Sequence, residues 1–319
     1  MKLQKIPRHS ADVGGRLSAG AATAYDAAGA DYLSYADGDP TRPFEFEGCL
    51  GFADREIWRR IDARLAQLAA AGQRHIRILD AGCGPGTWLG RIVLGAHTHG
   101  FTTIEAHGLD ISPAMVALAR TTLHLACSVH DITGARLDVS LADLNQRLPF
   151  PDRHFDIGLC LYGVLNHLPR ASHAAVASEL ARVTGDALFV TVRAVGSLPT
   201  IYVDRLDRAR SYRQDNDADW LDVDLADGRH LGFPSHLFRA DELRGLFRPL
   251  LGTVATIGLD VFHGRFATDP NWNPRAIRGQ DSFDESLDRL EREYGSDPNF
   301  IDRAAHILLV GEQSPGAHS

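Results

Sequence analysis

The sequence predicts one large α/β domain built on a doubly wound, mostly parallel sheet of seven strands, with helices before it and two insertions. Two observations predict this fold class. Short apolar runs typical of buried strands alternate with amphipathic helical segments between residues 75 and 192. The first of these runs also ends in a glycine-rich turn that leads directly into a helix, as in nucleotide-binding sheets. The 319 residues are enough to bury a substantial core.

The segment before the sheet, residues 1–72, is predicted to be helical and is a candidate lid. Residues 1–20 are polar and glycine-rich, whereas Ala21–Tyr35 favours a helix that carries Tyr25, Tyr32 and Tyr35. We expect these three tyrosines to pack along one side of the helix, in preference to forming a lid whose hydroxyls contact a ligand. After a Gly/Pro-rich turn, a second helix is predicted from about Ala53 to Ala71, because apolar residues recur there at helical spacing. The domain proper is expected to span 73–319.

The remaining elements follow from the same periodicities. The predicted strands are His75–Leu79, Ile104–Leu109, Leu137–Leu141, Phe155–Leu161, Ala187–Val192, Val254–Phe262 and His306–Val310. The predicted helices between them are Thr87–Ala96, Pro113–Leu125, His173–Val183 and Asp241–Leu250.

Two long stretches, 197–239 and 265–303, interrupt the alternation. The first contains a predicted hairpin, Trp220–Leu225 and Arg229–Phe233, around an Asp-Gly turn. Before the hairpin, arginines alternate with aspartates, which favours a solvated helix of mixed charge (Arg205, Arg208, Arg210 and Arg213 with Asp204, Asp207 and Asp215). The second contains a charged helix near Asp284–Tyr294. Insertions of this length are usually caps or binding loops, so substrate recognition is predicted there.

Composition limits the partners. The formal net charge of −8 argues against a large phosphate-binding surface, so no nucleic-acid partner is expected. Four widely spaced cysteines suggest neither a zinc site nor a disulfide framework, and no metal is predicted (Cys49, Cys83, Cys127 and Cys160). The sequence lacks a recognisable signal peptide and any apolar run long enough for a membrane span. A cytoplasmic protein is expected, and the oligomeric state stays open.

The segment Ile78–Gly86 reads Ile-Leu-Asp-Ala-Gly-Cys-Gly-Pro-Gly. A strand followed by Gly-x-Gly lets a ligand approach the backbone closely, although a glycine turn can also serve packing alone. Asp80 before the glycines and Thr87 in place of a third glycine depart from the dinucleotide pattern. The segment instead resembles the first motif of class I S-adenosylmethionine-dependent methyltransferases. The resemblance implies a Rossmann-like fold and S-adenosylmethionine as cofactor, contacted at Asp80, Gly82, Cys83 and Gly84.

Two later segments extend the resemblance over about residues 76–192. The second predicted strand ends in Asp110, where a carboxylate can accept hydrogen bonds from ribose hydroxyls, with Glu105 the weaker candidate. The third strand leads to Asp143 and then to the run Leu148-Pro-Phe-Pro-Asp-Arg-His-Phe-Asp156. By resemblance, Asp143 receives the adenine amino group, with Leu144 and Ile111 beside the ring. Taken alone, Asp143 equally fits a helix cap.

Residues just past the fourth strand, including Leu161, line the junction between cofactor and acceptor in this family. His167 is the first candidate for a catalytic base, because histidine exchanges protons near neutrality. A histidine that supports neighbouring residues or caps a helix is an equally good interpretation. Tyr162 either closes over the methionine part of the cofactor or packs. Arg193, at the end of the fifth strand, is a candidate for holding an acidic substrate. The (Asp/Asn)-Pro-Pro-(Tyr/Phe) motif of DNA amino-methyltransferases is absent here.

The sequence therefore predicts methyl transfer to a small-molecule acceptor. Three alternatives stay open: a nicotinamide-dependent oxidoreductase, a non-catalytic S-adenosylmethionine-binding protein, and a protein or RNA methyltransferase that docks its substrate on the insertions. The methylated atom and the need for a base are not specified by the sequence.

Overall fold

The structure, a computed structural model, describes residues 20–26, 29, 39–46, 50–197, 209–263 and 281–314. Tyr32, Tyr35 and most of the arginine–aspartate stretch before residue 209 lie outside these residues. Among the described residues, no helix has an apolar stretch sufficient to cross a bilayer.

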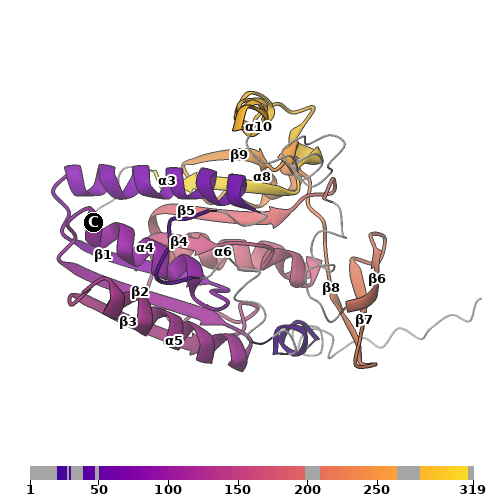
Figure 1. The fold of residues 1–319 in the computed structure, drawn as a ribbon, viewed down its shortest axis with the longest axis horizontal. Helices are drawn as coiled ribbons and strands as arrows, with labels where there is room; N and C mark the ends of the chain where they lie inside the picture. Colours follow the sequence, from indigo (N-terminus) through magenta and orange to yellow (C-terminus); the bar gives the residue numbers. More distant parts are fainter. Residues whose placement is uncertain are drawn as a thin grey trace, which may run out of the picture.

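A twisted sheet of seven strands forms the centre of the molecule (Figure 1). Its order is β3-β2-β1-β4-β5-β10-β9, and β10 runs antiparallel to both of its neighbours whereas the other pairs are parallel. The strands are β1 His75–Ala81, β2 Thr103–Asp110, β3 Ala135–Leu141, β4 Phe155–Cys160, β5 Thr184–Arg193, β9 Thr253–Leu259 and β10 His306–Glu312. The predicted doubly wound, mostly parallel sheet is confirmed.

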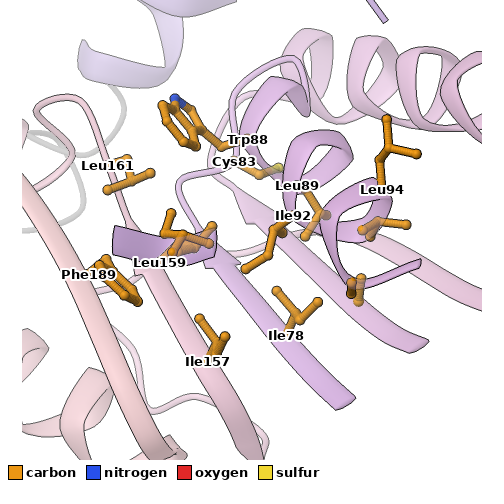
Figure 2. Packing of buried hydrophobic residues seen from close by; sticks show 14 of the residues in the cluster. Ile78, Cys83, Trp88, Leu89, Ile92, Leu94, Ile157, Leu159, Leu161 and Phe189 are labelled. Carbon is orange, nitrogen blue, oxygen red and sulfur yellow. The ribbon is translucent and has the colours of Figure 1, made fainter. Parts of the chain in front are cut away.

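Helices cover both faces of this sheet. One face carries α3 Gly51–Ala70, α4 Thr87–Thr98 and α5 Pro113–Val129, and the other carries α6 His173–Val183 and α8 Ala240–Phe247. The predicted stripe of α3 is buried completely at Ile57, Ile61 and Leu65. Figure 2 shows how apolar side chains of α4 pack on those of β1, β4 and β5. Burial of this kind is the main favourable contribution to folding.

A second, three-stranded antiparallel sheet lies to one side of the main sheet (Figure 1). It consists of β6 Ala209–Asp215, β7 Trp220–Leu225 and β8 His230–Pro234. The predicted hairpin is therefore confirmed, but the prediction of a mixed-charge helix is wrong for 209–215. Cross-strand pairs explain the error, because Arg213 lies 3.5 Å from Asp222 and Ser211 donates to Asp224 at 2.7 Å. Local charge alternation does not reveal such partners.

The second insertion ends in helix α10 Asp281–Tyr294, which is anchored by one acidic side chain. The carboxylate of Glu291 accepts three backbone hydrogen bonds, from the N–H groups of Val261, Phe262 and His263, at 2.7–2.9 Å. Asp288 on the same helix lies 2.7 Å from Nε2 of His263. These contacts hold α10 beside the end of β9.

The glycine turn after β1 gives a test of the packing. Gly82 has φ +81°, and a Cβ atom there would lie 2.3 Å from Cγ2 of Val164 in the segment after β4. Gly100 has a similar φ of +82° with no atom within 4 Å, so it is a matched control for backbone strain alone. We expect Gly100→Ala to lower the free energy of unfolding by about 1–2 kcal/mol, and Gly82→Ala by about 1–3 kcal/mol more because Val164 must move. Urea denaturation measures both, and equal losses would contradict the packing described.

Candidate functional site

The glycine turn is fixed to the end of the neighbouring strand β2. The backbone N–H groups of Gly82 and Cys83 both donate to the carbonyl of Leu109, at 2.7 and 2.9 Å. The next amide, that of Gly84, donates to Oδ2 of Asp110 at 2.8 Å. Gly82, Gly84 and Gly86 all have positive φ, a conformation that favours glycine. Cys83 is buried between them, and its Sγ would be 3.0 Å from a Cβ atom on Gly108.

Two buried carboxyl groups, Asp80 and Asp110, face this turn. Asp80 is 2% exposed, and within the described residues its Oδ2 has no hydrogen-bond partner. Burial, reinforced by the negative charge of Asp110, raises the pKa of Asp80 to about 7. Burial also raises the pKa of Asp110, although the N–H groups of Ser112 and Gly84 act in the opposite direction. The arrangement favours a ligand that brings positive charge.

The first described helical segment, 20–26, is attached next to Asp110. Oδ1 of Asp26 accepts hydrogen bonds from the Ser112 hydroxyl at 2.5 Å and from the Ala114 N–H at 3.2 Å, at the start of α5. Ser112 also caps α5 by accepting from the Met115 N–H at 3.1 Å. Ile111, between Asp110 and this cap, is partly exposed. The N-terminal segment thus reaches the edge of the sheet.

Asp143 is brought to the same edge by a backbone bond. The Ala142 N–H donates to the Asp110 carbonyl at 2.8 Å, so Asp143 follows directly. Its Oδ1 accepts from both the backbone and the side-chain amide of Asn145, at 2.9 and 2.8 Å. This is a local turn of the capping type. The neighbouring Leu144 is buried in the core.

Past β4, the chain turns sharply at Tyr162, which has φ +56°. Its N–H donates to the Thr191 hydroxyl at 2.5 Å, and its phenol hydrogen-bonds Asp54 of α3. Burial and the negative charge of Asp54 raise the pKa of this phenol well above its usual value, so it stays neutral. The Tyr162 ring also meets the His306 ring edge-on, with 5.3 Å between centroids. Leu161, one residue earlier, is buried.

His167 closes the short 3₁₀ helix Leu165–His167. Its Nδ1 lies 3.0 Å from the Pro234 carbonyl at the end of β8, and since a carbonyl only accepts, Nδ1 carries the proton. Burial, with a further effect of the positive charge of Arg193, lowers the pKa of His167 to about 4. The imidazole is therefore neutral at pH 7, with its lone pair on Nε2. The rings of Tyr25 and Phe233 lie edge-on to it at 5.8 and 5.2 Å.

The side chain of Asn166 connects the end of β5 with the segment that follows β8. Its Oδ1 accepts from the Arg193 N–H at 2.9 Å, while its Nδ2 donates to the Arg193 carbonyl at 3.2 Å and to the His236 carbonyl. Arg193 is buried, and its positive charge contributes to lowering the pKa of both His167 and His306. The ends of β4, β5 and β8 therefore form one connected structure.

The structure reveals residues to which the sequence analysis assigned no role. Asp54, besides binding Tyr162, lies 3.3 Å from the guanidinium of Arg91, which is 1% exposed and packs over the rings of Trp88 and Phe46. Arg91 interrupts the apolar run of α4, and Asn166 interrupts that of the segment after β4. Such isolated polar residues in apolar runs are a sequence signal for buried pairing.

A family model described as a methyltransferase domain matches residues 78–186. Three similar solved structures are a DhpI–SAH complex (14% identity, 94% of this chain and 98% of the other, TM-score 0.48), a SAM-dependent methyltransferase from Methanosarcina mazei (16%, 76% and 93%, 0.45) and the CcbJ methyltransferase from Streptomyces caelestis (14%, 80% and 95%, 0.44). A search of curated proteins finds no match.

The raised pKa of Asp80 has a consequence for stability. Because its folded-state pKa of about 7 exceeds the usual 3.8, the folded protein holds a proton that the unfolded chain releases, and stability falls as pH rises between these values. Asp80→Asn removes this dependence. In ligand-free protein, we expect the stability gain of Asp80→Asn over wild type to be larger at pH 8 than at pH 5 by about 2 kcal/mol.

Urea denaturation at the two pH values tests this. Asp138→Asn is the control, because Asp138 lies in β3 with an exposed side chain. Its effect on stability should be the same at pH 5 and pH 8. A gain for Asp80→Asn that is the same at both pH values would show that Asp80 is ionised throughout.

Proposed function

We propose that this chain, which belongs to the class I S-adenosylmethionine-dependent methyltransferases, transfers a methyl group to a small-molecule acceptor that His167 orients. The observation that carries the proposal is the position of His167. It follows Val164, which contacts the glycine turn at Gly82, and it is a neutral imidazole whose Nε2 lone pair is available to accept a hydrogen bond.

The residues present fit the cofactor. S-adenosylmethionine supplies a methyl group on a positively charged sulfonium, so its displacement releases a neutral thioether. Asp80 and Asp110 are two buried acids that disfavour each other's ionisation, and a cationic ligand relieves this cost. Gly82, Cys83 and Gly84 would lie along the ligand. Asp110 accepts the Gly84 amide at Oδ2 and the Ser112 amide at Oδ1, and a carboxylate has further lone pairs that could accept from ribose hydroxyls. Asp143, Leu144 and Ile111 would contact the adenine, and Leu161 the junction with the acceptor.

His167 contributes by orientation. With a pKa of about 4, it is a weak base at neutral pH, so its main role is to accept a hydrogen bond from the O–H or N–H of the acceptor at Nε2. Aligning the acceptor lone pair with the methyl group contributes part of the roughly 7–11 kcal/mol available from orientation. Tyr162 takes a positioning role instead of a chemical one, because its phenol is engaged by Asp54.

The parts outside the central sheet would complete the acceptor site. We assign residues 1–72 as an N-terminal helical lid and 73–319 as the methyltransferase domain, with the insertions 197–239 and 265–303 forming the acceptor surroundings. Tyr25 from the lid and Phe233 from β8 both lie against His167, and this supports the assignment.

One pair of measurements separates the alternatives. Calorimetry should show binding of S-adenosylhomocysteine and none of NAD; the opposite result would establish an oxidoreductase. A screen with radiolabelled S-adenosylmethionine should then label small molecules. Labelling of RNA or protein instead would indicate a macromolecular acceptor, and binding without any labelling would indicate a non-catalytic protein.

Asp110 gives the prediction for cofactor affinity. We expect Asp110→Ala to weaken S-adenosylhomocysteine binding more than about tenfold, because both the ribose acceptor and the Gly84 anchor are lost. Calorimetric titration measures the change. Asp138→Ala on the next strand is the matched control, and unchanged affinity in Asp110→Ala would refute the ribose assignment.

His167 gives the prediction for turnover. We expect His167→Ala to lower kcat by about 10²-fold or more while the cofactor Kd stays within about twofold. Since its pKa lies near 4, the wild-type rate should not decline through protonation of His167 between pH 6 and 9. Steady-state kinetics with an acceptor from the screen tests both statements. His124→Ala, exposed on α5, is the control, and full activity in His167→Ala would remove the residue from the reaction.

A further inference from the structure

The side chain of a buried histidine, His236, lies between two acidic side chains. The side chain of His236 is 6% exposed, with Nδ1 2.7 Å from Oδ1 of Asp219 and Nε2 3.0 Å from Oε1 of Glu242. Asp219 lies in the turn between β6 and β7, and Glu242 lies in the first turn of α8. The ring therefore bridges the small sheet and the main domain.

The geometry specifies the protonation of this ring. An ionised carboxylate only accepts hydrogen bonds, so a ring nitrogen that faces one must carry a proton. Both nitrogens of His236 face carboxyl groups: that of Asp219, which is partly exposed, and that of Glu242, which also lies 3.3 Å from Arg170. His173 is a further titratable neighbour, 5.3 Å away between ring centroids.

The same short segment also determines the proton position of His167. The Pro234 carbonyl accepts from Nδ1 of His167, the Ser235 N–H donates to the Asp219 carbonyl at 2.8 Å, and the His236 backbone binds Asn166 through both its N–H and its carbonyl. Displacing His236 would therefore move the carbonyl that holds the proton of His167 on Nδ1.

We propose that His236 is a doubly protonated clamp between Asp219 and Glu242, and that this clamp positions His167 and fixes its tautomer for the transfer step. The first half of the proposal concerns His236 alone, whereas the second half rests on the proposed function. Charge-assisted hydrogen bonds of this kind are about twice as strong as neutral ones, which suits a contact that attaches one sheet to another.

Nuclear magnetic resonance of ¹⁵N-histidine-labelled protein saturated with S-adenosylhomocysteine at pH 7.5 tests the clamp without any acceptor. Signals are assigned by their loss in His236→Gln and His167→Ala. We expect two N–H protons on His236, and one on His167 at Nδ1 with Nε2 unprotonated. A His236 ring with a single N–H would overturn the clamp.

Two variants then test the coupling. In His236→Gln, both N–H donors of the amide are on one nitrogen, so they cannot replace donors at the two separate ring positions, and the Nδ1–H form of His167 should give way to a mixture of tautomers. With the acceptor from the screen, kcat should fall about tenfold or more while the cofactor Kd stays within about twofold. Asp219→Asn, an isosteric change, should remove one N–H signal of His236, which keeps the test decisive if His236→Gln folds poorly.

His230→Gln is the matched control. His230 lies on β8 of the same small sheet and also faces two carboxylates, those of Asp222 at 3.3 Å and Asp224 at 2.9 Å, but its side chain is 60% exposed. The variant should leave the His167 signals unchanged. An unaltered His167 tautomer in His236→Gln would overturn the coupling while leaving the methyltransferase function intact, and failure to bind S-adenosylhomocysteine would overturn the function instead.

Discussion

The hydrogen bonds between the glycine turn and the end of β2 are the constraint on which the rest of the site depends. Three consecutive amides, from Gly82 to Gly84, donate to Leu109 and Asp110. They fold the backbone after β1 back onto the neighbouring strand, and this leaves room only for glycine against Val164. Because Val164 leads into the 3₁₀ helix that carries His167, the glycine turn also positions that helix.

Much of the fold was predictable because the sequence of its core alternates between the short apolar runs of strands and the helical spacing of apolar residues. Helix α6 has the predicted bounds, and every predicted strand of the main sheet exists. The start of β5 and the whole of β6 differ from the prediction. Strand β5 begins at Thr184 instead of Ala187, because Arg64 and Gln313, both remote in sequence, hold Asp186. Strand β6 was predicted as a helix, because its charged residues are paired across strands.

The placement of the motif residues at one edge of the sheet was predictable from the sequence, but most of the contacts around them were not. Motif residues such as Asp80, Asp110 and Asp143 lie at or just past the carboxyl ends of strands, which any parallel sheet brings to one edge. The unpredicted contacts join distant segments: Asp54 with Tyr162, Asp26 with Ser112, and Pro234 with His167. No local pattern specifies such pairs. The sequence could indicate that Arg91 and Asn166 are buried and paired, but it could not name their partners.

The small sheet has an apolar cluster of its own, formed by Leu221, Val223, Leu225 and Phe233, separate from the two clusters of the main domain. Few side chains of the main core would have to change if this sheet were altered in length or replaced. Such an arrangement places different constraints on the residues of the two sheets. Residues that pack against the seven-stranded sheet are constrained by that packing. The sequence of the small sheet can vary more, provided that residues 234–236 keep their contacts with the main domain.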